Sequence, residues 1–155
     1  MFLKLEGSKT GQIRGESSDA SHGQEIELVH WSWGMKSPSA LGGGGAATRT
    51  HLSELSVVKY ADTASTALMS VMRNNELVKK AVLTVRKSGT KPIDYFVVTI
   101  ERGRITSFDI ESESAETPVL VERIALSFEK INVEYFAQDQ TGGKQGGSAF
   151  TADVS

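Results

Sequence analysis

Residues 25–35, which read EIELVHWSWGM, constrain the fold of this chain more than any other stretch. Both tryptophans, Trp31 and Trp33, lie here two positions apart, so a β-strand would place them on one face. The apolar positions are even-numbered upstream, at Ile26 and Leu28, and odd-numbered downstream. This change of phase predicts one long strand with a β-bulge, or a strand that leaves one sheet and joins another. In either case the two tryptophans are expected in the core.

Most of the remaining chain also has strand patterns. We expect short strands over residues 2–5, 52–60, 80–87, 92–101, 104–111 and 148–154, separated by polar turns and by loops at 8–23, 111–117 and 138–147. Residues 102–103 are expected to form one of the turns. Residues 119–136 predict a second very long strand with a bulge near residues 129–130, because its apolar phase changes there. Phe128 is assigned to the core on this strand.

Residues 62–75 are the only good helix candidate. Asp62 offers an N-cap side chain, and Leu68 and Met72 fall on one face at helical spacing. A helix of about three turns is marginal alone, so this face is expected to dock on a sheet and to belong to the core. One helix among many strands predicts a mainly β fold, a closed or nearly closed antiparallel β-barrel of two sheets with one short flanking α-helix. We expect a single domain over residues 1–155.

The glycine-rich segment at residues 36–50 is the longest excursion between predicted strands. A loop of this length without internal structure is uncommon in a compact domain, where it usually serves a function or is disordered. Because it is not expected to fold by itself, we expect it to contact a neighbouring subunit. The residues assigned to this subunit-interface loop are Ser37, Pro38, Ser39, Ala40, Leu41, Gly42, Gly43, Gly44 and Gly45.

The composition narrows the classes of partner and compartment. There is no cysteine, so neither a disulfide framework nor a thiolate metal site is available. A net charge of -2 with both signs mixed argues against a nucleic-acid partner, which would require a basic face. No apolar run reaches transmembrane length and residues 1–7 lack a signal-peptide pattern, so we expect no membrane partner and a cytoplasmic product.

The residues that could form a catalytic or metal-binding site do not have the arrangement that such a site requires. Ser17, Asp19 and His22 have the residue types of a catalytic triad, but they lie in one polar loop, whereas working triads assemble from separate elements. His22, His30 and His51 have no zinc-ligand spacing. We therefore expect no enzyme activity, no metal and no cofactor.

Two further patterns are candidate ligand sites. The four consecutive glycines at residues 42–45 lack the Lys-Ser/Thr that follows them in a phosphate-binding loop. The two tryptophans with Tyr95 and Tyr135 would make a platform for a sugar or another small ligand, but aromatic stripes at strand spacing more often belong to the core. The acidic residues between 111 and 116 are expected to form a solvated loop.

Several segments in the same order resemble one known family. They are Gly15-Glu16-Ser17, His22, the run from Ile26 to Met35 with its WSWG sequence, the glycines at 42–45, LSVVKYAD at 55–62, AVLTVRKSG at 81–89, and residues 124–135. Together they resemble haemolysin-coregulated protein (Hcp), the tube subunit of bacterial type VI secretion. The match spans nearly the whole chain and departs from the family in residues 8–13, residues 102–116 and a short tail.

The resemblance implies a structural role. It implies a β-barrel with one flanking helix, a homo-hexameric ring, and rings stacked into a hollow tube that carries effector proteins in its lumen. It also implies a valine-glycine-repeat spike protein and a contractile sheath as partners, secretion without a signal peptide, and neither catalysis nor a cofactor. The alternative function is a monomeric ligand-binding β-barrel, with an enzyme third.

Strand alternation then assigns residues to the lumen. If Trp31 and Trp33 face the core, Ser32 and His30 face the opposite side. Small neutral side chains on a tube wall let varied cargo approach without leaving a charge buried and unpaired. We therefore expect Ser32 and His30 to line the inner wall of the ring.

Overall fold

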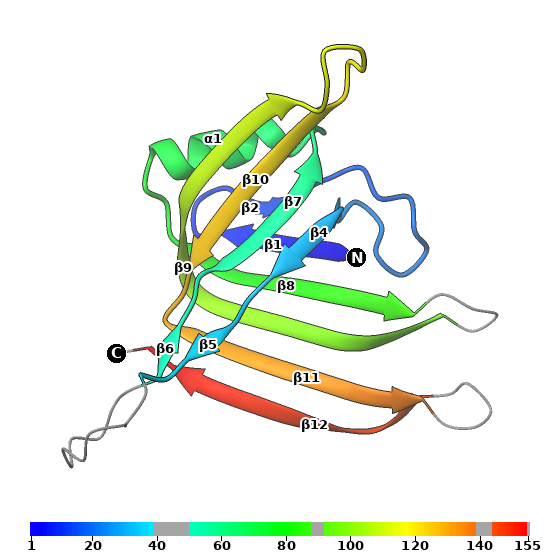
Figure 1. Ribbon diagram of the computed structural model, residues 1–155, viewed down its shortest axis with the longest axis vertical. Coiled ribbons are helices and arrows are strands. Elements are labelled where there is room, and N and C mark those ends of the chain that lie inside the picture. Colours follow the sequence, from blue (N-terminus) through cyan, green and yellow to red (C-terminus); the bar gives the residue numbers. More distant parts are fainter. Residues whose placement is uncertain (39–49, 88–91, 139–143, 155) are drawn as a thin grey trace.

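The computed structural model describes residues 1–38, 50–87, 92–138 and 144–154 (Figure 1). Within these ranges it has one α-helix and a predominance of antiparallel strands. In chain order the elements are β1 (Phe2–Gly7), β2 (Gly11–Ile13), β3 (Ile26–Glu27), β4 (His30–Ser32), β5 (Met35–Lys36), β6 (His51–Leu52), β7 (Leu55–Tyr60), α1 (Ser65–Arg73), β8 (Val78–Lys87), β9 (Ile93–Ser112), β10 (Leu120–Ser127), β11 (Lys130–Gln138) and β12 (Lys144–Asp153).

Ten of these strands form a continuous sheet that folds into two parts. We call the first part sheet A; in it β1 pairs with β2, β3 and β8, β8 pairs with β9, β9 with β11, and β11 with β12. Sheet B has the strand order β9, β10, β7, β4. The 20-residue strand β9 belongs to both sheets and carries the chain from the lower part of Figure 1 to the upper part. Strands β5 and β6 pair only with each other among the described strands.

The expected turn at residues 102–103 is wrong, because β9 bends there and continues. Arg102 has a φ of 55°, and a side chain at Gly103 would collide with the carbonyl oxygen of Ser127. The glycine therefore allows the two backbones to approach closely at the bend. The partner chain breaks at the same level, since β10 ends at Ser127 and β11 begins at Lys130. The expected single long strand over residues 119–136 is therefore also wrong.

The first long strand is divided as well. Residues 25–35 form three short strands with three different partners: β3 pairs with β1, β4 with β7, and β5 with β6. The prediction of one continuous strand is wrong, whereas the change of sheet that the apolar phase indicated is confirmed. The odd-numbered apolar series also does not stay in the core, since Val29 is 43% exposed and Met35 is 48% exposed.

The core lies between the two sheets and under α1. Its buried side chains come from β1, β2, β3 and β7 to β11, and the fully buried ones include Leu5, Leu55, Leu83, Ile100 and Ile131. The helix contributes Leu68 and Val71, and it packs against β9. Such an amphipathic helix gains most of its stability from this packing.

The helix is shorter than the expected range of 62–75. Asp62 lies before it, and its carboxylate accepts a hydrogen bond from the backbone N–H of Ala64 at 2.9 Å. After the last helical residue, Asn75 adopts a φ of 50° and turns the chain toward β8. The mainly β, antiparallel fold with one short helix is confirmed. The predicted closure of the barrel is not decided in this way. The pairings between described strands form no complete ring, so a closed barrel stays a prediction.

Candidate functional site

The three triad-type residues lie close together, but their geometry differs from that of a catalytic triad. The Ser17 hydroxyl accepts a hydrogen bond from the backbone N–H of Asp19 at 3.2 Å. The two ring nitrogens of His22 face carboxylates, with Nδ1 2.9 Å from Glu25 Oε2 and Nε2 3.0 Å from Asp94 Oδ2. The imidazole therefore has no ring nitrogen directed at the serine. This arrangement provides no general base for nucleophilic attack.

The same residues hold the loop at 14–25 against sheet A. Arg86 donates a hydrogen bond to Asp19, and this contact holds the pKa of the Asp19 carboxyl below its ordinary value and raises the pKa of Arg86. The Arg86 guanidinium lies 5.0 Å from the centre of the Phe2 ring, and Phe2 stacks on His22 at 4.5 Å. This stack joins the loop to β1, β8 and β9, so we assign the cluster to structure.

The other ligand-site hypotheses also lack a supporting geometry. Among the described residues, no group of three or more His, Cys, Asp or Glu side chains is placed to hold a metal ion. Trp31 stacks on Phe96 at 5.6 Å, whereas Tyr95 meets Tyr135 edge to face at 6.4 Å. Trp31 therefore pairs with an aromatic ring other than Tyr95 and Tyr135, and these contacts do not unite the four residues in one platform. The four glycines at 42–45 lie outside the described residues.

The outward face of sheet B presents a row of small neutral side chains. Ser32 on β4 is opposite Ser56 on β7, Ser56 is opposite Ala125 on β10, and Ala125 is opposite Ser107 on β9. Cross-strand partners on one face have Cβ atoms about 4.5–5.5 Å apart, so the four side chains form one continuous line. They line shallow depressions on the sheet surface. We call this set the serine row.

A second row beside the first is charged at one end. His30 is opposite Val58, Val58 is opposite Arg123, and Arg123 is opposite Asp109. His30 and Arg123 are exposed. The Arg123 guanidinium also lies 3.9 Å from the Glu111 carboxylate, so its charge is partly balanced. The structure thus places His30 and Ser32 on one solvent-facing surface, away from the core.

Sequence reasoning found two members of this surface and missed the rest. The signal was available, because Leu55 and Val57 occupy the buried phase of β7 and leave Ser56 on the opposite face. Residues assigned to the core have mixed positions. Leu68 and Phe128 are buried, whereas Trp31, Trp33 and Met72 are partly buried and pack against the core.

A buried ionic network under the helix was also missed. Lys59 and Glu122 are fully buried, and the Lys59 ammonium lies 2.6 Å from Glu122 Oε1 and 2.8 Å from Asp62 Oδ1. Ser65 on α1 also accepts a hydrogen bond from the Lys59 ammonium at 3.1 Å. The signal was a lysine in phase with the buried Leu55 and Val57. This network joins β7, β10 and the start of α1.

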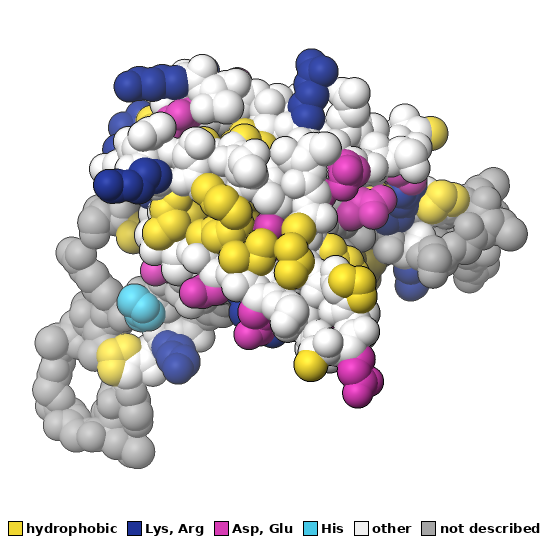
Figure 2. Space-filling model, turned by 90° about the horizontal axis from the view of Figure 1, so that it is seen from above, with side chains coloured by type: hydrophobic (Ala, Val, Ile, Leu, Met, Phe, Trp, Pro, Cys, Tyr) yellow, Lys and Arg dark blue, Asp and Glu magenta, His cyan; other side chains and the backbone are white. Residues whose placement is uncertain are grey.

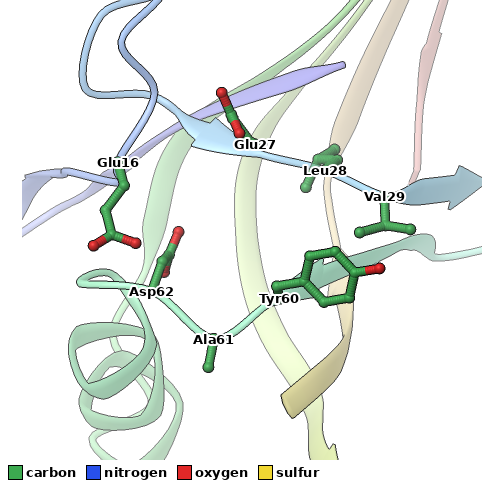
Figure 3. Close-up of a pocket in the computed structure, with 7 residues that line it drawn as sticks. All are labelled: Glu16, Glu27, Leu28, Val29, Tyr60, Ala61 and Asp62. Atoms are coloured by element: carbon green, nitrogen blue, oxygen red, sulfur yellow. The ribbon is translucent and has the colours of Figure 1, made fainter. Parts of the chain in front are cut away.

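A pocket at one end of sheet B combines apolar and acidic residues. We call it the end pocket; it is lined by Glu16, Glu27, Leu28, Val29, Tyr60, Ala61 and Asp62. In Figure 3 the side chains of Glu16 and Asp62 point toward one another at one side, and Val29 lies beside the Tyr60 ring at the other. Tyr60 is 45% exposed and Val29 is 43% exposed. Figure 2 views this end and shows hydrophobic side chains in a band across it.

A projecting two-stranded element lies at the opposite end of sheet B. Strands β5 and β6 follow β4 and precede β7, and they extend from the body at the lower left of Figure 1. We call this pair, residues 35–36 with 51–52, the arm. It exposes Met35, Lys36 and His51. Ser37 and Pro38, from the expected interface loop, are exposed beside it, and the remaining residues of that loop lie outside the described ranges.

Comparisons with known proteins agree on one group. A family model described as "Type VI secretion system effector, Hcp" matches residues 2–135. Protein hcp1 of Pseudomonas aeruginosa is 33% identical over 150 residues, which cover 95% of this chain and 89% of that protein. A solved type VI secretion system effector from Yersinia pestis has a TM-score of 0.78 at 28% identity, covering 99% of this chain and 98% of that one. A solved type six secretion system protein has a TM-score of 0.85 at 21% identity, covering 99% and 95%.

Proposed function

Since this chain belongs to the Hcp family of type VI secretion system proteins, we propose that it is a structural subunit of the secretion tube. In this proposal six copies form a ring, rings stack into a hollow tube, and effector proteins travel in the lumen. The tube partners would be a valine-glycine-repeat spike protein and a contractile sheath. The subunit is made in the cytoplasm and leaves through the type VI machine, with no enzymatic step and no cofactor.

The serine row is the observation that carries the lumen assignment. Four small side chains without charge cross all four strands of sheet B, while the opposite face of that sheet packs into the core. A wall of this kind lets a folded cargo approach without leaving a desolvated charge unpaired. We therefore assign Ser32 and His30 to the inner wall of the ring, together with Ser56, Ser107 and Ala125.

The interface assignment rests on the arm and on the position of residues 37–45 directly after its first strand in the sequence. A closed ring needs a heterologous contact in which two different surfaces of each subunit meet. The arm projects from the body and exposes Met35, which favours a partner surface on another copy. We propose that residues 37–45 contact that copy. Shortening residues 39–45 should then weaken assembly while the far-ultraviolet spectrum of the subunit keeps its β character.

Sedimentation velocity on the purified full chain tests the ring directly. We expect a hexamer, and negative-stain microscopy of the same sample should show rings with a central hole. A monomer at high concentration would contradict the proposal and would favour a ligand-binding β-barrel.

The inner-wall assignment has its own test in Ser32→Cys, since the chain has no other cysteine. Small maleimides should label the ring and bulky ones should not; equal labelling would place Ser32 outside the lumen.

A further inference from the structure

The end pocket contains carboxylates without an ion-pair partner among the described residues, and it also contains exposed apolar side chains. Glu16 is exposed and forms no ion pair or side-chain hydrogen bond with the described residues, and the same holds for Glu27. Asp62 directs one carboxylate oxygen to the buried Lys59, 2.8 Å away. The apolar side is formed by Leu28, Val29 and Tyr60. The pocket therefore fits a ligand that presents a cation on one side and an apolar group on the other (Figure 3).

The arm has the complementary chemistry. Its two strands expose Met35, 48% accessible, on one face, and Lys36 and His51, which are opposite each other in the pair, on the other face. No carboxylate occurs in residues 35–38 or 50–52. Lys36 has no ion-pair partner among the described residues. A charged pocket and an oppositely charged projection on the same chain steer two copies into one relative orientation.

The arm and the end pocket of one chain cannot meet. Tyr60 and Val29 lie where β7 ends and β4 begins, whereas Met35 and Leu52 lie where β4 ends and β7 begins. From Val29 to Met35 the chain is extended, which separates them by roughly 20 Å at about 3.3 Å per residue. The two surfaces thus lie at opposite ends of sheet B. Contact between them is possible only between copies placed head to tail.

We propose that the arm of one subunit docks in the end pocket of a second copy of this chain. Met35 packs against Leu28, Val29 and Tyr60, and Lys36 pairs with Glu16 and Asp62. The contact is heterologous, because each copy offers its arm at one end and its pocket at the other. This inference rests on the proposed self-assembly, and it adds the pocket that receives the arm.

Cysteine cross-linking of the assembled full chain tests this contact. A double variant, Val29→Cys with Met35→Cys, should give a ladder of covalent oligomers on a denaturing gel after treatment with a short bis-maleimide. The matched control pairs Val29→Cys with Thr66→Cys, an exposed position on α1, and should give no ladder. If the Met35 variant assembles like the wild type and gives no ladder, the arm does not occupy the pocket. A wild type that stays monomeric would instead contradict the proposed function, and this inference with it.

Charge reversal distinguishes the arm from another occupant. Glu16→Lys should weaken self-association by about tenfold or more, because it places like charges together at the contact. Adding Lys36→Glu to the same chain should restore most of the loss, whereas adding Lys87→Glu should not. Lys87 lies at the end of β8, is also exposed, and has its ammonium 5.9 Å from the centre of the Tyr95 ring. Rescue by Lys87→Glu alone would overturn the assignment and identify the β8–β9 hairpin as the occupant.

Discussion

Lys59 is a charged side chain in the middle of an apolar layer. Its ammonium forms ion pairs with Glu122 and Asp62 and donates a hydrogen bond to Ser65, and these contacts offset its desolvation. One oxygen of the Glu122 carboxylate, Oε2, is buried with no hydrogen-bond partner among the described residues. Removing the Lys59 ammonium would leave the buried Glu122 carboxylate without a counter-charge and would lower the free energy of unfolding. This dependence leads to the first prediction.

Lys59→Met should destabilise the subunit by about 3–5 kcal/mol, because it leaves the Glu122 carboxylate buried and unpaired. Adding Glu122→Leu to the same chain should recover most of the loss, since the pair is then replaced by apolar groups of similar size. Urea denaturation followed by circular dichroism measures both values. A single variant that unfolds at the wild-type urea concentration would contradict the role assigned to this network.

Glu76 gives a prediction about pH. Its carboxylate accepts hydrogen bonds from the backbone N–H groups of Thr10, at 2.8 Å, and Lys9, at 3.0 Å, and from the Thr10 hydroxyl at 2.8 Å. These donors, the Thr10 N–H first, hold the pKa of Glu76 below its ordinary value of 4.5. The stabilisation is therefore complete above the ordinary pKa and is lost as the pH falls through the folded-state pKa.

Glu76→Gln should accordingly reduce the dependence of stability on pH. We expect the variant to be less stable than the wild type at pH 7, by about 1–3 kcal/mol, and the two to converge as the pH is lowered below 4.5. Thermal melting at a series of pH values gives this difference. A constant difference across the acidic range would show that the charge of Glu76 is not responsible.

At the scale of elements, the bend in β9 holds the two sheets together. Gly103→Ala should cost about 1–3 kcal/mol, because a methyl group there meets the Ser127 carbonyl of the neighbouring strand. Gly34→Ala is the matched control: a side chain at Gly34 meets no atom within 4 Å, so its effect should stay within about 0.5 kcal/mol. Equal losses of unfolding free energy would contradict the close-approach explanation.

The same bend shows what the sequence can and cannot predict. Alternation identified most strands, and the phase change after Leu28 correctly indicated a change of sheet. At residues 102–103 the sequence resembles a turn, but in the structure β9 continues through them. At residues 128–129 the sequence resembles a continuous strand, but in the structure β10 ends before them and β11 begins after them. Local propensity does not distinguish these cases, because whether a strand continues depends on the neighbouring strands with which it forms hydrogen bonds.

The candidate surface shows a similar limit. Alternation from Trp31 and Trp33 placed Ser32 and His30 on the outward face, where the structure has them exposed. The serine row could not be predicted from the sequence, because its members come from four strands whose register is set by pairing between distant segments. The end pocket likewise joins residues near 16, 28 and 60, whose proximity depends on the tertiary fold.

At the scale of the whole molecule, the inner-wall assignment predicts a separation of assembly from transport. Ser32→Gln enlarges one member of the serine row without adding charge, so subunit stability should change by less than about 0.5 kcal/mol and the ring should persist. Retention of an effector that co-purifies with the ring should fall. Ser70→Gln, on the exposed surface of α1, is the control and should retain cargo normally. A normal yield of cargo with Ser32→Gln would contradict the assignment.

The shared strand β9 also has a mechanical consequence. Because one 20-residue backbone runs through both sheets, a force that slides sheet B past sheet A is carried first by covalent bonds. Side-chain packing between the layers then has to resist only the remaining load. If the tube is driven by a contracting sheath, each subunit receives a push at one end and transmits it to the other. The bend at Arg102 and Gly103 is the position on β9 where that load would change direction.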